Sequence, residues 1–200
     1  MEKIKSEAYC VSVKKLQPSF DTVLQDLITW FEKSEVKAVI IGGIAVSLLG
    51  KPRTTQDIDA LILLEQDEWA KFFNLGKQFG FQARISNALQ FAKKNRVLLM
   101  QHSSGIDLDL SFGALPFEEE SVSRRKFVKL GKLKLPLPTP EDLIIMKAVA
   151  HRPKDLIDIE MILAAHPKLD KKRIKKWVHE FAEVLENPEI DKDLTLLLKK

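Results

Sequence analysis

Two aspartates, Asp57 and Asp59, stand two positions apart at the start of an apolar stretch. In a β-strand successive side chains point to opposite faces, so we expect both carboxylates on one face and Ile58 on the other. Paired carboxylates repel each other at neutral pH unless a cation neutralises them. Such oxygen ligands suit Mg²⁺, which often binds together with nucleotide phosphates. An acidic pair alone is more often a solvated strand edge or a turn cap, so the surrounding residues decide.

A glycine pair, Gly42 and Gly43, precedes these aspartates and follows the apolar, β-branched stretch 37–41, which predicts a short buried strand. The glycines allow a tight turn and a close approach of backbone to ligand. A helical stretch follows and ends at residues 50–52. Amides at the start of a helix bind phosphate groups, so we expect those of Gly42 and Gly43 to do so here. Ser47 would add a hydroxyl group.

A third carboxylate is available in residues 105–113, whose sequence is GIDLDLSFG. Alternation places Asp107, Asp109 and Ser111 on one face and apolar side chains on the other. An ordinary amphipathic strand with one solvated face is the alternative, although such strands carry paired aspartates less often than Thr, Lys or Glu. Either aspartate is a candidate ligand.

Along the chain, an apolar strand is followed by Gly-Gly, a helix, Pro-Arg-Thr-Thr and Asp-Ile-Asp. The order of these segments resembles the nucleotidyltransferase superfamily of DNA polymerase β-like fold. The resemblance implies transfer of an NMP from an NTP to a hydroxyl group, with pyrophosphate leaving. Asp57 and Asp59 would bridge two Mg²⁺ ions roughly 3.5–4 Å apart, and Asp109 would complete the site. Asp109 is preferred over Asp107 because residues 109–118 resemble the segment after the third carboxylate in bacterial families. Asp109 or a metal-bound water would take the acceptor proton.

A second motif lies in residues 138–163. Thr139 and Pro140 are a strong helix start, and a break near 151–153 opens a second helix. The segment is similar to the Pro-x-Asp-Leu-x-x-x-Lys … Arg-x-Lys-Asp-Leu-x-Asp-Ile motif of the abortive-infection-type nucleotidyltransferase toxins. The resemblance then covers roughly residues 35–165.

This second resemblance implies that Lys147 contacts the nucleotide phosphates and that Asp155 or Asp158 helps to orient the nucleotide. Arg53 lies a few residues before the first aspartates and would also reach phosphates. The alternative is that Lys154, Asp155 and Asp158 form salt bridges on a helix surface, at i,i+3 and i,i+4 spacing.

The predicted fold is α/β (α+β), with a mixed sheet flanked by helices. We expect a nucleotidyltransferase core over 1–137 and a helical domain over 138–200. Helices are predicted at 19–34, 66–79 and throughout the segment after 138. Strands are predicted at 37–41, 57–64, 81–85, 96–101 and 105–112, with a hairpin of 124–130 and 132–135.

The composition agrees with a cytoplasmic enzyme. The chain has 200 residues, 45% of them hydrophobic, but no apolar run of the ~20 residues that a membrane span needs and no signal-peptide core. Its single cysteine, Cys10, excludes an internal disulfide and fits a reducing compartment. The histidines are scattered, so no zinc site is expected. The net charge of +4 is modest, but basic runs at 124–126 and 168–176 are either solvated or bind RNA.

The acceptor stays open. Family resemblance favours RNA, with the tRNA 3′ end first, in a toxin–antitoxin setting where an antitoxin is a candidate partner. Wider relatives modify a protein tyrosine or a small-molecule drug. Two further alternatives are a catalytically silent nucleotide- or RNA-binding module of the same fold and a nucleic-acid-binding protein that acts through residues 168–176.

Overall fold

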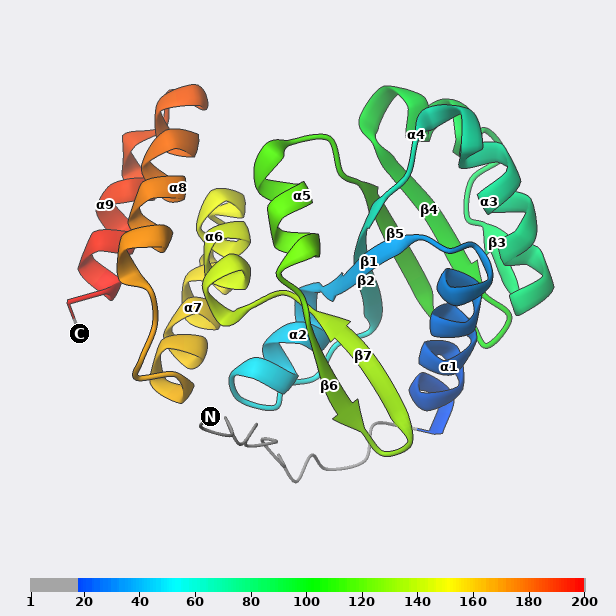
Figure 1. The fold of residues 1–200 in the computed structure, drawn as a ribbon, viewed down its shortest axis with the longest axis horizontal. Coiled ribbons are helices and arrows are strands. Elements are labelled where there is room, and N and C mark those ends of the chain that lie inside the picture. Colours follow the sequence, from blue (N-terminus) through cyan, green and yellow to red (C-terminus); the bar gives the residue numbers. More distant parts are fainter. Residues whose placement is uncertain (1–17, 200) are drawn as a thin grey trace, which may run out of the picture.

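The computed structural model describes residues 18–199 (Figure 1). Cys10, on which the expected reducing compartment rests, lies outside the described residues. None of the helices within 18–199 combines the length and the apolar character that crossing a membrane requires.

Helices and strands alternate in the first two thirds of the chain, and the last third is helical. The helices are α1 (Pro18–Lys33), α2 (Gly42–Leu49), α3 (Trp69–Gly76), α4 (Ala88–Asn95), α5 (Pro116–Ser123), α6 (Pro140–Ala150), α7 (Pro153–Ala165), α8 (Lys171–Val184) and α9 (Pro188–Leu197), with short 3-10 turns η1 (Gln66–Glu68) and η2 (Lys77–Phe79) beside α3. The strands are β1 (Lys37–Ile41), β2 (Asp57–Leu63), β3 (Phe81–Ala83), β4 (Val97–His102), β5 (Asp107–Phe112), β6 (Lys126–Leu130) and β7 (Leu133–Leu137).

Five strands form one mixed sheet in the order β1-β2-β5-β4-β3, and β6 and β7 form a separate hairpin. The central pair, β2 and β5, is parallel, whereas the other neighbours are antiparallel. The parallel pair needs a long connection, which η1, α3, η2, β3, α4 and β4 supply. The predicted mixed α/β fold is thus confirmed.

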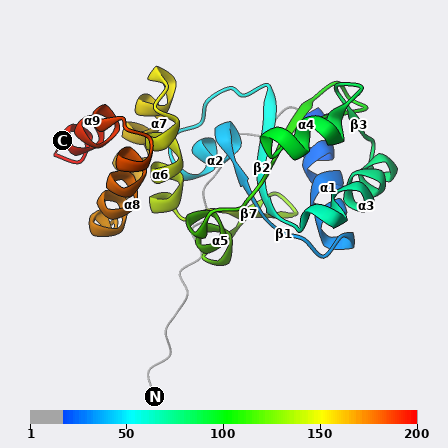
Figure 2. The same ribbon diagram turned by 90° about the horizontal axis from the view of Figure 1, so that it is seen from above.

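Alternation divides the sheet into two unlike faces. Ile58, Ile62 and Phe112 are buried on one face, which α1, α3 and α4 cover (Figures 1 and 2). Trp69 at the start of α3 stacks on Phe112 there, with ring centroids 3.8 Å apart. The other face carries the strand aspartates, and beside them Leu61 packs with Val122 of α5. One face therefore anchors the sheet while the other positions polar side chains.

Most strands and the hairpin lie where the sequence predicts them, but two expectations need correction. The helix expected over 66–79 is broken into η1, α3 and η2. A Cβ on Gly76 would lie 2.5 Å from Trp30 Cζ2, so the end of α3 packs tightly onto α1. Strand β3 ends at Ala83 rather than at residue 85. Helices α4 and α5 are absent from the prediction.

The C-terminal helices pack on the sheet half through α2. The His166 ring nitrogen Nε2 lies 2.6 Å from the Leu49 carbonyl oxygen, and a Cβ on Gly50 would come 3.3 Å from the backbone of Ile162. Hydrophobic residues from α1 to the end of α9 belong to one cluster. The division at residue 138 stays a prediction.

Candidate active site

The acidic face of the sheet is set by the register of β2 and β5. Asp59 lies opposite Asp109, and Asp57 lies opposite Asp107. Paired residues in a parallel ladder point to the same face, so these four carboxylates share the side covered by α2 and α6. A cavity of about 280 Å³ opens above three of them, Asp57, Asp59 and Asp109. It is lined by Ile41, Gly42, Gly43, Arg53, Thr55, Asp57, Asp59, Asp109, Leu143, Met146, Lys147, Ala150, Arg152 and Lys154.

Asp59 has a raised pKa and packs closely against the start of α2. Burial raises its pKa, and the negative charges of Asp57 and Asp109 raise it further, while the cations Lys147 and Arg152 act in the opposite direction. Gly42 has a positive φ of 62°, and a Cβ placed there would lie 1.8 Å from Asp59 Oδ2. Only glycine therefore leaves room for this carboxylate beside the start of α2.

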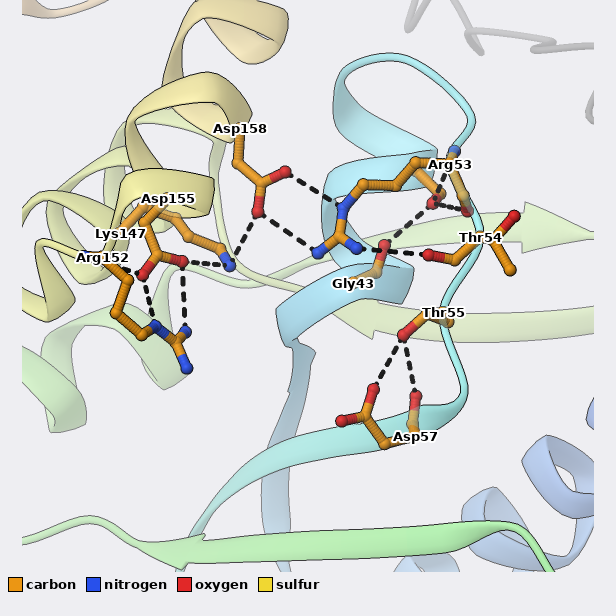
Figure 3. Close-up of polar contacts among 10 residues, drawn as sticks. Gly43, Arg53, Thr54, Thr55, Asp57, Lys147, Arg152, Asp155 and Asp158 are labelled. Carbon is orange, nitrogen blue, oxygen red and sulfur yellow. Dashed lines mark hydrogen bonds and ion pairs between the residues drawn. The ribbon is translucent and has the colours of Figure 1, made fainter.

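Gly43 and the loop before β2 form a second close contact. A Cβ on Gly43 would lie 2.4 Å from the Thr55 hydroxyl oxygen. That hydroxyl donates to Asp57 Oδ1 at 2.8 Å (Figure 3). The glycine pair thus brings the first turn of α2 against the strand that carries Asp57 and Asp59.

Five charged side chains form a chain of ion pairs at the opposite wall of the cavity (Figure 3). Lys147 of α6 lies at its centre, 2.8 Å from Asp155 Oδ1 and 3.0 Å from Asp158 Oδ2. Arg53 pairs with Asp158 at 3.0 Å, and Arg152 pairs with Asp155 at 2.5 Å. These ion pairs connect the loop between α2 and β2 to the junction of α6 and α7.

The two acids in this network are buried, with Asp155 0% and Asp158 2% exposed. Burial raises the pKa of Asp155, but hydrogen bonds from Arg152 and Lys147 outweigh it and lower the pKa overall. Surface salt bridges are therefore the wrong description of these two buried residues: Asp155 does pair with Arg152 at i,i+3, but both acids also pair with Lys147 of α6, and Asp158 pairs with Arg53 of the loop before β2. Lys154 is exposed at the mouth of the cavity.

Ser47 takes a different position from its neighbours in the glycine segment. Its hydroxyl oxygen lies 2.9 Å from the Gly43 carbonyl oxygen and accepts a hydrogen bond from the Arg53 amide at 3.3 Å. Ser47 is not among the residues that line the cavity. In this structure it joins the first turn of α2 to the loop that carries Arg53.

The two candidates for the third carboxylate differ in environment. Asp109 lines the cavity, and burial raises its pKa although Arg84 opposes that effect. Asp107 does not line the cavity, and hydrogen bonds from Arg84 and Gln101 lower its pKa. The geometry therefore favours Asp109. Arg84 was not predicted as a site residue, because the only local signal in the sequence is an arginine after a short strand.

The donor chemistry of this face fits a divalent cation. Asp57, Asp59 and Asp109 are hard oxygen donors, and their mutual repulsion is what a dication would relieve. Within residues 18–199, no three carboxylate, imidazole or thiolate groups stand close enough together to coordinate one ion as they are placed.

Comparison with solved structures agrees with this fold. The solution structure of the antibiotic-resistance factor ANT(2'')-Ia has a TM-score of 0.61 at 12% identity, covering 87% of this chain and 97% of that one. ANT(2'')-Ia in complex with adenylyl-2''-tobramycin has a TM-score of 0.55 at 11% identity and covers 84% and 99%. The lincomycin-bound lincosamide antibiotic adenylyltransferase LnuA has a TM-score of 0.52 at 15% identity and covers 76% and 99%.

At these identities the likeness shows the fold alone. No curated protein sequence matches the chain. A family model matches residues 19–198, nearly the whole chain and all of the site described above. The chain therefore belongs to the family described as Nucleotidyltransferase of unknown function (DUF6036).

Proposed function

We propose that this nucleotidyltransferase transfers an NMP from an NTP to a hydroxyl group in a reaction that depends on a divalent metal ion, with Mg²⁺ the expected ion. The observation that carries the proposal is the convergence of Asp57, Asp59 and Asp109 on one cavity, beside the glycine start of α2. Asp57 and Asp59 would bind the metal, with Asp109 as the third ligand. The ion, when bound, stabilises negative charge on the attacking and leaving oxygens.

The remaining residues bind and orient the substrates. Gly42 and Gly43 offer backbone amides to the β- and γ-phosphates. Lys147 and Arg53 line the cavity, but both are paired with buried aspartates, so we assign them a fixed rather than a mobile positive charge. In the transfer step the acceptor oxygen bonds to the α-phosphorus and the bond to the β-phosphate oxygen breaks. Pyrophosphate leaves, and Asp109 accepts the hydroxyl proton.

For the acceptor, a small hydroxylated molecule with an apolar part has structural support. A second cavity of about 200 Å³ shares Ile41 and Met146 with the catalytic cavity. Its other walls include Leu61, Phe117 and Phe181, and Ser111 lies two residues beyond Asp109 on the same face of β5. A compartment of this size fits a small apolar group. Two proteins that share the fold are ANT(2'')-Ia, solved in complex with adenylyl-2''-tobramycin, and the lincosamide antibiotic adenylyltransferase LnuA, solved with lincomycin bound.

An RNA acceptor, with the tRNA 3′ end as the toxin-like case, is the second candidate. It is favoured by four exposed lysines in the first turns of α8, namely Lys171, Lys172, Lys175 and Lys176. Arg173, from the same run, instead pairs with the buried Asp142 and with Glu120, and its side chain is only 11% exposed, so we do not count it in a phosphate-binding surface.

A transfer assay decides between these acceptors and tests the reaction itself. The protein is incubated with each α-³²P-labelled NTP and Mg²⁺, together with total RNA, a protein extract or a panel of aminoglycosides and lincosamides. An Asp57→Ala/Asp59→Ala variant is run in parallel. Label that appears in one acceptor class and is lost in the variant supports the proposal and names the acceptor. Absence of transfer to every class, despite Mg²⁺-dependent NTP binding, favours a silent nucleotide-binding module.

A further inference from the structure

Arg84, the first residue after β3, joins the two aspartates of β5. Its Nη1 lies 2.5 Å from Asp107 Oδ2, and its Nη2 lies 2.5 Å from Asp109 Oδ1. One guanidinium group thus bridges a carboxylate of the catalytic cavity and a carboxylate outside it. Such a bridge uses the planar fork of arginine, which lysine cannot reproduce.

The sheet delivers Arg84 to this position across an intervening strand. The Arg84 amide donates to the Leu99 carbonyl oxygen at 3.0 Å, which extends the pairing of β3 with β4 by one residue. Leu99 in turn lies opposite Asp109 in the pairing of β4 with β5. The side chain therefore needs to cross only one strand to reach Asp109.

Arg84 approaches Asp109 from outside the cavity. Asp109 is a lining residue of the cavity, whereas Arg84 is not. The bond to Arg84 uses Oδ1, and Oδ2 of Asp109 accepts no hydrogen bond from residues 18–199. Asp107 holds the other arm of the guanidinium and is itself fixed by Gln101 at 2.8 Å. Asp107 thus holds the Arg84 guanidinium group outside the cavity.

We propose that Arg84 is a positioning residue for the transfer reaction. It fixes the Asp109 carboxylate by one oxygen, leaves the other oxygen for the cavity, and reduces the negative charge that Asp57, Asp59 and Asp109 present to a divalent cation. The inference rests on the proposed function, because Asp109 is taken there as the third carboxylate. In this arrangement Asp107 holds the other arm of the Arg84 guanidinium group in place.

A positioning role for Arg84 predicts a change in metal affinity that a purely structural role would not. Replacing Arg84 by the uncharged methionine removes a positive charge beside the metal-binding carboxylates, so a divalent cation should bind more tightly. The same change frees Asp109 to rotate, so turnover should fall. Metal affinity and turnover would therefore move in opposite directions.

The test compares the full-length wild type with Arg84→Met, Arg84→Lys, Asp107→Asn and Asp109→Asn, and uses Arg125→Met as an arginine control outside the cavity. Free Mn²⁺ is measured by electron paramagnetic resonance, and thermal unfolding monitors the fold. For Arg84→Met we expect Mn²⁺ affinity about tenfold higher. We also expect kcat roughly ten- to a hundredfold lower, with KM for the NTP changed less than about threefold. Arg84→Lys should lie between this variant and the wild type, and Asp109→Asn should bind Mn²⁺ more weakly. Arg125→Met should match the wild type in Mn²⁺ affinity.

Two results would overturn the inference: unchanged Mn²⁺ affinity and kcat in Arg84→Met, or weaker Mn²⁺ binding together with a lower melting temperature. The proposed function fails in a different way, when the wild type binds Mn²⁺ but transfers no NMP to any acceptor. In that case, tighter Mn²⁺ binding by Arg84→Met still supports the inference, and unchanged binding rejects it.

Discussion

Asp59 of β2 and Asp109 of β5 lie directly opposite each other in the parallel pairing at the centre of the sheet. Neighbouring strands in a sheet are about 4.8 Å apart, so two carboxylates on one face at this register are held close by the backbone itself. The charge of Asp109 is accordingly one of the causes that raise the pKa of Asp59. The fold thus maintains a repulsion that costs stability and that a bound cation would relieve.

Asp59→Asn should stabilise the protein at neutral pH and abolish transfer. The pKa of Asp59 is raised above its ordinary value of 3.8, mainly by burial. The contribution of this group to stability is therefore fully present below the unfolded-state pKa and is lost as pH rises through the raised folded-state value. We expect a melting temperature higher by about 2–4 °C at pH 7, measured by calorimetry, with the gain disappearing at acidic pH.

The same variant should lose NMP transfer by on the order of 10³-fold, because it removes one of the proposed metal ligands. Added Mg²⁺ should raise the melting temperature of the wild type and leave that of Asp59→Asn nearly unchanged. Asp67→Asn, on the exposed turn η1, serves as the control. An Asp59→Asn protein that melts below the wild type at pH 7 would contradict the electrostatic account.

Gly42→Ala should reduce transfer far more than Gly131→Ala. Both glycines have similar positive φ angles, 62° and 59°, so the backbone strain of an L side chain is matched. A Cβ on Gly131 meets nothing within 4 Å, whereas on Gly42 it would displace the Asp59 carboxylate. Activity and melting temperature of both variants are compared. Equal losses of activity would mean that strain alone, rather than the contact with Asp59, makes glycine necessary.

Lys147→Met should strongly destabilise the protein. Lys147 is 5% exposed and pairs with two buried aspartates, which would lose their shared cation. Leaving buried charge uncompensated costs about 3–5 kcal/mol. Urea unfolding measures the loss, with Lys176→Met as the exposed lysine control. A loss below about 1 kcal/mol, the range of surface pairs, would show that Arg53 and Arg152 suffice to neutralise the two acids.

Leu115→Trp should impair use of a small acceptor while leaving NTP binding intact. Leu115 is 47% exposed and lines the apolar compartment beside the catalytic cavity, so a larger ring narrows its mouth without entering the core. Leu185→Trp, at a similarly exposed leucine outside the compartment, is the matched control. The readouts are KM for the acceptor and Kd for an NTP analogue. An unchanged acceptor KM would exclude the compartment from acceptor binding.

The strands and the acidic face were predictable because both depend on local alternation. Asp57, Asp59 and Asp109 could be assigned to faces from neighbouring residues alone. The position of Arg84 was not predictable, because it depends on two successive strand pairings, β3 with β4 and β4 with β5. The burial of Asp155 was missed for a similar reason. Spacing along α7 shows which side chains share a helix face but not which helix covers that face.

The residues that form the cavity are spread along the chain, so they emerge at different times during translation. Gly42 and Asp59 come early, but Arg53 finds its partner only in Asp158 of α7, and Asp109 arrives with β5. A ribosome-bound chain that ends before α7 lacks the acids that hold Arg53 and Lys147 in place. The cavity above Asp57, Asp59 and Asp109 is therefore complete only after most of the polypeptide has been translated, so a shorter nascent chain lacks part of its wall.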